Sequence, residues 1–229
     1  MAWAFVQSTI AVPASGTASS IVGIQFGANV TAGNTIIVAA CRSGTTAGST
    51  ITDSLGNTFI VRKEINDATN GDSMCVGDAV NAIGGASSIT VHFPTGGFRA
   101  IVAHEYSGIG AFDVTAGQAG VSSAANSTIA TTTGTGDLIF GAIHNDGGTS
   151  TNASSGAGFT RRTFQQYTAG AAYAMASEDK NQAAAGSTRA QFNQNAADGY
   201  ICIMTTYSPS GGGGGDVANW WGLSLMGIQ

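Results

Sequence analysis

The chain has 229 residues, enough for one large β domain or two small ones, and either can bury a core. Only 9% of the residues are charged and 34 are glycines, while 43% are apolar and occur in short β-branched runs. This combination predicts a folded chain with many turns. The net charge of −5, without any run of Lys or Arg, argues against nucleic acid as a partner.

The N-terminal segment, "MAWAFVQSTIAVP", has neither a basic start nor a long apolar stretch. We therefore expect a strand here and no signal peptide. No apolar run in the chain approaches the roughly 18 residues of a membrane span, so we expect none. Trp3 lies in this first strand, where it would either cap the core or contact a neighbouring subunit.

The rest of the chain alternates short apolar runs with turns rich in Gly, Ser, Thr and Asn. Strands spaced by about ten residues with turn signals between them are typical of an all-β sandwich or barrel. No stretch has a sustained helical period. The predicted strands are 3–10, 20–26, 34–41, 57–65, 73–80, 87–93, 99–106, 112–119, 126–131, 137–144, 158–166, 171–178, 187–194 and 199–207.

An internal repeat runs through these strands, with units of about 100 residues. Three segments align in order: "GNTIIVAAC" (33–41) with "GDLIFGAIH" (136–144), "SLGNTFIVR" (54–62) with "SSGAGFTRR" (154–162), and 74–107 with 175–208 without a gap. The alignment pairs Phe59 with Phe159, Arg62 with Arg162, Asp78 with Asp179, and Tyr106 with Tyr207.

The repeat predicts an antiparallel, jelly-roll-like β-sandwich that spans residues 1–208. Its two pseudo-repeats would cover about 20–109 and 120–208. The alternative is two tandem Ig-like sandwiches. The joining segment "GIGAFDVTAGQAGVSSAANS" carries Phe112, Val114 and Val121 and reads as a strand, which favours one merged sandwich.

Several of these motifs support a resemblance over about residues 5–208. "ITDSLGNTF" (51–59), "NAIGGASSITVHF" (81–93), "HEYSGI" (104–109) and "TTGTGDLIFGA" (132–142) resemble jelly-roll or lectin-like sandwich modules of phage virion proteins and bacterial surface proteins. The resemblance implies a role in assembly, adhesion or glycan binding. Because its motifs are turn and strand patterns, it is specific for the fold and weak for function.

Catalytic chemistry has little support in the residue pattern. His104 and Glu105 are neighbours in a strand and should face opposite sides, and their aligned positions carry Thr205 and Thr206.

The loop "INDATNGD" (65–72) has the composition of a calcium loop but lacks EF-hand spacing, so a polar hairpin is favoured. The cysteines Cys41, Cys75 and Cys202 lie in apolar runs and are expected to be buried. We therefore expect no enzyme, no cofactor and no metal.

The C-terminal segment follows the repeat as a Gly-rich linker at 209–216 and an apolar peptide at 217–229. As a strand, Trp221, Leu223 and Leu225 share one face, whereas a helix would contain two destabilising glycines. An extended apolar peptide can pair with the edge of a sheet or bind in a groove. The predicted subunit-contacting residues are Trp3, Trp220, Trp221, Leu223, Leu225 and Met226.

These observations favour a structural protein that self-assembles or decorates a larger assembly, at a virion surface or in an extracellular filament. Its partners would be copies of itself or another structural subunit. The alternative is a carbohydrate-binding or adhesion module with a surface glycan as its partner.

Overall fold

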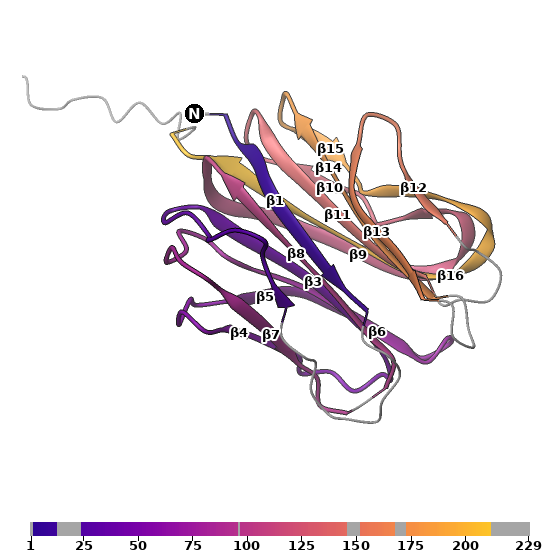
Figure 1. The fold of residues 1–229 in the computed structure, drawn as a ribbon. Coiled ribbons are helices and arrows are strands. Elements are labelled where there is room, and N and C mark those ends of the chain that lie inside the picture. Colours follow the sequence, from indigo (N-terminus) through magenta and orange to yellow (C-terminus); the bar gives the residue numbers. More distant parts are fainter. Residues whose placement is uncertain (1, 13–23, 96, 146–151, 168–172, 212–229) are drawn as a thin grey trace, which may run out of the picture.

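The computed structural model describes residues 2–12, 24–95, 97–145, 152–167 and 173–211 (Figure 1). Every regular element among them is a β-strand, and these strands pair in antiparallel fashion. The predicted all-β antiparallel sandwich is therefore confirmed.

The first half of the chain forms a five-stranded sheet in the order β1-β8-β3-β6-β5, with a small sheet β2-β7-β4 against its outer face. Apart from the β5–β6 hairpin, the strands that pair in these two sheets are distant in the chain, as in jelly-roll folds. The bounds are β1 Ala4–Ala11, β2 Ile24–Gln25, β3 Thr35–Ser43, β4 Thr50–Asp53, β5 Ile60–Asp67, β6 Asp72–Ala79, β7 Ser88–His92 and β8 Arg99–Ser107.

The second half forms a large sheet in which β9-β16-β11-β14-β13 follow the same order as the first. β12 also pairs with β16, and β10 with β15. The bounds are β9 Ile109–Asn126, β10 Ala130–Thr132, β11 Asp137–Asn145, β12 Ala153–Ser155, β13 Thr160–Tyr167, β14 Tyr173–Gln182, β15 Gly186–Thr188 and β16 Gln191–Pro209.

The two large sheets pack face to face through one central hydrophobic cluster. On β3, Ile37, Ala39 and Cys41 enter this cluster, while the alternate residues face the small sheet of the first half. β11 divides its side chains in the same way between the central cluster and the outer layer of the second half. Period-two alternation thus supplies two buried faces on one strand, which explains the near-continuous apolar runs at the centre of each half.

The edges of the two large sheets also meet. β1 contacts β13 along one side of the central cluster, and β5 contacts β9 along the other. Each half has its own inner and outer layer, and the halves share the cluster between them.

Two kinds of element differ from the sequence expectation. β4 and β12 were not predicted, because "TITD" and "ASS" are short and carry little apolar alternation. β9 and β16 extend well beyond the predicted strands because they pair with each other across several register shifts. Pairing of this kind satisfies the backbone of the polar segments that looked like loops.

Candidate functional site

Both ends of the described chain meet beside the turn between β8 and β9 (Figure 1). The carbonyl of Gly108 accepts a hydrogen bond from the Ser210 N–H at 2.7 Å. Gly108 has a φ of 72°, and a Cβ there would lie 2.5 Å from the carbonyl oxygen of Ala2. We call this region, formed by Ala2, Trp3, Gly108, Pro209 and Ser210, the terminal pole.

Trp3 is half-buried at the terminal pole. Its ring packs against the central cluster and meets Tyr106 edge to face, with centroids 5.9 Å apart. Beside it lies a hollow of about 400 Å³, whose lining residues are Ala2, Trp3, Thr135, Gly136, Asn181 and Pro209. Trp3 therefore packs against the central cluster and also lines an open hollow.

The other predicted contact residues lie outside the described residues. These are Trp220, Trp221, Leu223, Leu225 and Met226. β16 ends at Pro209, so the chain enters the Gly-rich segment from the terminal pole.

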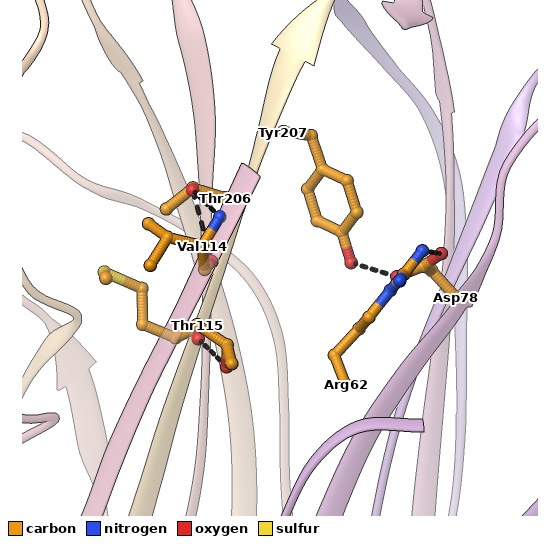
Figure 2. Close-up of polar contacts among 7 residues, drawn as sticks. Arg62, Asp78, Val114, Thr115, Thr206 and Tyr207 are labelled. Carbon is orange, nitrogen blue, oxygen red and sulfur yellow. Dashed lines mark hydrogen bonds and ion pairs between the residues drawn. The ribbon is translucent and has the colours of Figure 1, made fainter. Parts of the chain in front are cut away.

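The two halves are joined inside the sandwich by a cluster around Tyr207 (Figure 2). The Tyr207 hydroxyl donates to Asp78 Oδ2 at 3.0 Å, and Arg62 pairs with the same carboxylate at 2.7 Å. The Arg62 guanidinium also lies 4.3 Å from the ring centroid of Phe112. Arg62 and Asp78 come from the first half, whereas Phe112 and Tyr207 come from the second.

A second cluster, around Tyr106, has the same composition with the halves exchanged. The Tyr106 hydroxyl donates to Asp179 Oδ2 at 2.8 Å, and Arg162 Nε donates to that oxygen at 2.6 Å. The Arg162 guanidinium lies 4.3 Å from the ring centroid of Phe5. Residues that the sequence alignment paired therefore have matching partners, and each tyrosine reaches the carboxylate of the other half.

Burial and charge keep both tyrosines protonated. Burial, together with the charge of the neighbouring carboxylate, raises the pKa of Tyr106 and of Tyr207 well above the usual value. The hydrogen bond to Asp78 raises the pKa of Arg62. Each buried carboxylate is thus held by one cation and one hydroxyl donor, which is the arrangement that a buried charge requires.

Figure 2 also shows how β9 follows β16 next to the Tyr207 cluster. The register shifts between Thr205 and Tyr207, and there the N–H of Val114 donates to Thr206 Oγ1 at 3.0 Å. Thr115 Oγ1 donates to the carbonyl of Met204 at 2.7 Å. Threonine hydroxyls therefore replace part of the backbone ladder at this irregular pairing.

A thiol, an imidazole and a carboxylate meet between the large sheets, a group that the sequence analysis missed. His144 Nε2 lies 3.3 Å from Asp72 Oδ2, and Cys41 interacts with the same imidazole. Burial lowers the pKa of His144, but Cys41 and Asp72 outweigh it, so the net pKa is well above the usual value. These residue types can form a nucleophile, base and orienting acid. All three side chains are buried, so a substrate has no access to them in this conformation.

The sequence contained one signal for this meeting, since Cys41 and His144 occupy aligned positions on the central strands of the two halves. Asp72 could not be added from the alignment, because the aligned position carries Tyr173.

His104 and Glu105 lie on opposite faces of β8. His104 Nε2 contacts Ser177 Oγ at 2.8 Å between the large sheets, and burial lowers the pKa of His104 to about 3. Glu105 instead accepts hydrogen bonds from Asn34 Nδ2 at 2.6 Å and from the N–H of Thr31 at 2.8 Å. The two side chains therefore have separate structural partners.

The loop with calcium-like composition is the turn of the β5–β6 hairpin. Asp67 Oδ1 accepts a hydrogen bond from the N–H of Thr69 at 2.9 Å, and Asp67 Oδ2 accepts one from Asn70 Nδ2 at 2.8 Å. This is side-chain capping of a turn. Within the described ranges, no group of three or more His, Cys, Asp or Glu side chains is arranged to hold a metal ion.

Comparison of the chain with protein-family models, with curated proteins and with solved structures found no match.

In the part of the chain that the structure describes, no helix has the length and apolar character needed to span a membrane.

Proposed function

We propose that this protein is a structural subunit of a larger assembly, a virion surface or an extracellular filament, and that its terminal segments contact neighbouring subunits. The observation that carries the proposal is the terminal pole. Because Ala2 and Ser210 both lie against Gly108, the C-terminal segment begins next to Trp3 and the 400 Å³ hollow. The Gly-rich segment that precedes the apolar C-terminal peptide therefore starts on the same side of the molecule as Trp3.

The composition of the C-terminal segment supports this role. Five glycines at 211–215 reach roughly 12–14 Å as a flexible chain, which is enough to cross to an adjoining subunit. Trp221, Leu223 and Leu225 alternate with small or polar residues, as expected of a peptide that adds to a sheet edge or lies in a groove. A tether of this length also raises the local concentration of the peptide at a nearby groove.

The buried clusters around Tyr106 and Tyr207 support the role in a different way. Each spans the two halves with charged and aromatic groups, so the halves should move as one body. A subunit that transmits contacts through an assembly benefits from such stiffness.

The test compares the full chain with a variant truncated after Gly211, by light scattering and sedimentation over a range of concentrations. We expect the full chain to form higher-order species and the truncated variant to remain monomeric. Trp220→Ala with Trp221→Ala in the full chain should reproduce most of the loss. Val121→Thr is the matched control, since it removes an apolar side chain that is 67% exposed on β9. Unchanged assembly after truncation would refute the role of the peptide.

A further inference from the structure

A hollow on the outer side of the second half contains two cationic side chains. It has a volume of about 250 Å³ and is bordered by Lys180 of β14, by Arg189 between β15 and β16, and by Phe159 before β13. The Lys180 ammonium lies 4.6 Å from the ring centroid of Phe159. Neither Lys180 nor Arg189 belongs to an ion pair within the described residues.

Hydrogen-bonding groups surround the two cations. Ser187, Thr188 and Gln191 also line the hollow. Thr188 is only 6% exposed, and its hydroxyl has no hydrogen-bond partner among the described residues. Its hydroxyl oxygen has almost no accessible surface, so Ser187 and Gln191 are the polar side chains that a ligand in the hollow can reach.

Glu178, on the same strand as Lys180, is directed to the backbone. Its carboxyl oxygens accept hydrogen bonds from the N–H of Gln191 at 2.8 Å and from the N–H of Gly156 at 3.0 Å. Burial raises the pKa of Glu178 to about 8, so the group is largely neutral at pH 7. The positive charge of Lys180 is then only partly offset at pH 7, and Arg189 adds a second cation at the hollow.

The first half lacks these charges at the aligned positions. Ala79 aligns with Lys180 and Ser88 aligns with Arg189, although Phe59 aligns with Phe159. Both halves nevertheless form a large sheet of the same strand order. The two cations are therefore not a requirement of the fold, and their presence in one half needs another explanation.

We propose that this hollow binds a carboxylated sugar residue. The carboxylate would pair with Lys180 and Arg189, the hydroxyls would meet Ser187 and Gln191, and the ring would pack on the apolar surface of Phe159. A volume of 250 Å³ is below the ~300–1,000 Å³ of pockets for drug-sized ligands, so it suits one sugar residue. A small inorganic anion would use the cations and leave the apolar surface uncovered. The site is separate from the terminal pole and does not depend on assembly.

The experiment titrates the intact protein with D-glucuronate, D-glucose and inorganic phosphate, followed by calorimetry or NMR. We expect D-glucuronate to bind at least tenfold more tightly than either of the other two. Equal binding of D-glucose would overturn the role of the cations, and equal binding of phosphate would overturn the sugar. Absence of saturable D-glucuronate binding would overturn the site.

Three variants locate the site. Lys180→Met and Arg189→Gln should each weaken D-glucuronate binding about tenfold or more, whereas Lys63→Met in the first half is the matched control and should bind as the unmodified protein does. Ser187→Ala removes an exposed hydroxyl that lines the hollow, so it should weaken binding without lowering stability. Unaltered affinity in Arg189→Gln, whose side chain is exposed, would contradict the assignment.

Discussion

At the scale of single residues, the hydroxyls of Tyr106 and Tyr207 carry much of the specificity of the junction. Each is fully buried and donates to a carboxylate of the other half. A hydrogen bond of this kind contributes little to the net free energy of folding. Removing the hydroxyl is costly, however, because it leaves the buried carboxylate with one donor fewer.

Tyr106→Phe and Tyr207→Phe should each lower the free energy of unfolding by about 1.5–3 kcal/mol, because the lost bond involves a charged group. Tyr200→Phe is the control, since the Tyr200 hydroxyl accepts from the neutral amide of Gln118 at 3.0 Å. Its cost should be smaller, about 0.5–1.5 kcal/mol. Denaturant titration measures all three. A negligible effect of either junction variant would contradict the role given to these clusters.

His104 should make the protein sensitive to acid. Its pKa is about 3 when folded, compared with an ordinary value of 6.5. The unfolded chain therefore binds the proton first as pH falls, and the stability present above pH 6.5 is lost progressively toward pH 3. By pH 5 the loss is about 2 kcal/mol.

His104→Gln should flatten the dependence of the unfolding free energy on pH between 6.5 and 5. His144 acts with the opposite sign, because its raised pKa makes its contribution complete below pH 6.5 and lost at higher pH. Equal slopes for His104→Gln and the unmodified protein would show that His104 is not the acid-sensitive group.

At the scale of elements, the turn between β8 and β9 holds the terminal pole together. Gly108→Ala would place a Cβ 2.5 Å from the Ala2 carbonyl oxygen. Gly56 has a similar φ of 77° with open space around it, so Gly56→Ala isolates the backbone strain alone. We expect Gly108→Ala to cost more than the ~1 kcal/mol of Gly56→Ala and to lower hydrogen-exchange protection in β1. Equal costs would show that β1 can move away freely.

At the scale of the whole molecule, the central cluster should make unfolding one event. Both large sheets bury their inner faces in it, so either half alone would expose that apolar face to water. We expect a single calorimetric transition whose enthalpy equals the van't Hoff value. Phe140→Ala should lower the unfolding free energy by about 3–5 kcal/mol while the transition stays single. Two separate transitions would show that the halves are independent domains.

Much of the fold could be predicted because it is local. The near-continuous apolar runs at 34–41 and 137–144 located β3 and β11 closely, since a short apolar run bounded by turn residues marks a strand that is buried on both faces, whatever it pairs with. β4 was missed because its short sequence has little apolar alternation, and it is a strand because its backbone pairs with β7. The hollow around Lys180 was missed because its residues are scattered over four separate parts of the second half.

By itself the sequence determined the all-β class, the faces of the central strands and the aligned pairs of Arg, Asp and Tyr. Only the tertiary structure decided that Tyr106 meets Asp179 and that Tyr207 meets Asp78, across 73 and 129 residues of chain. It also decided that the chain ends meet at Gly108. The physical reason is that alternation is encoded within each strand, whereas contacts between the halves depend on sheet order and register.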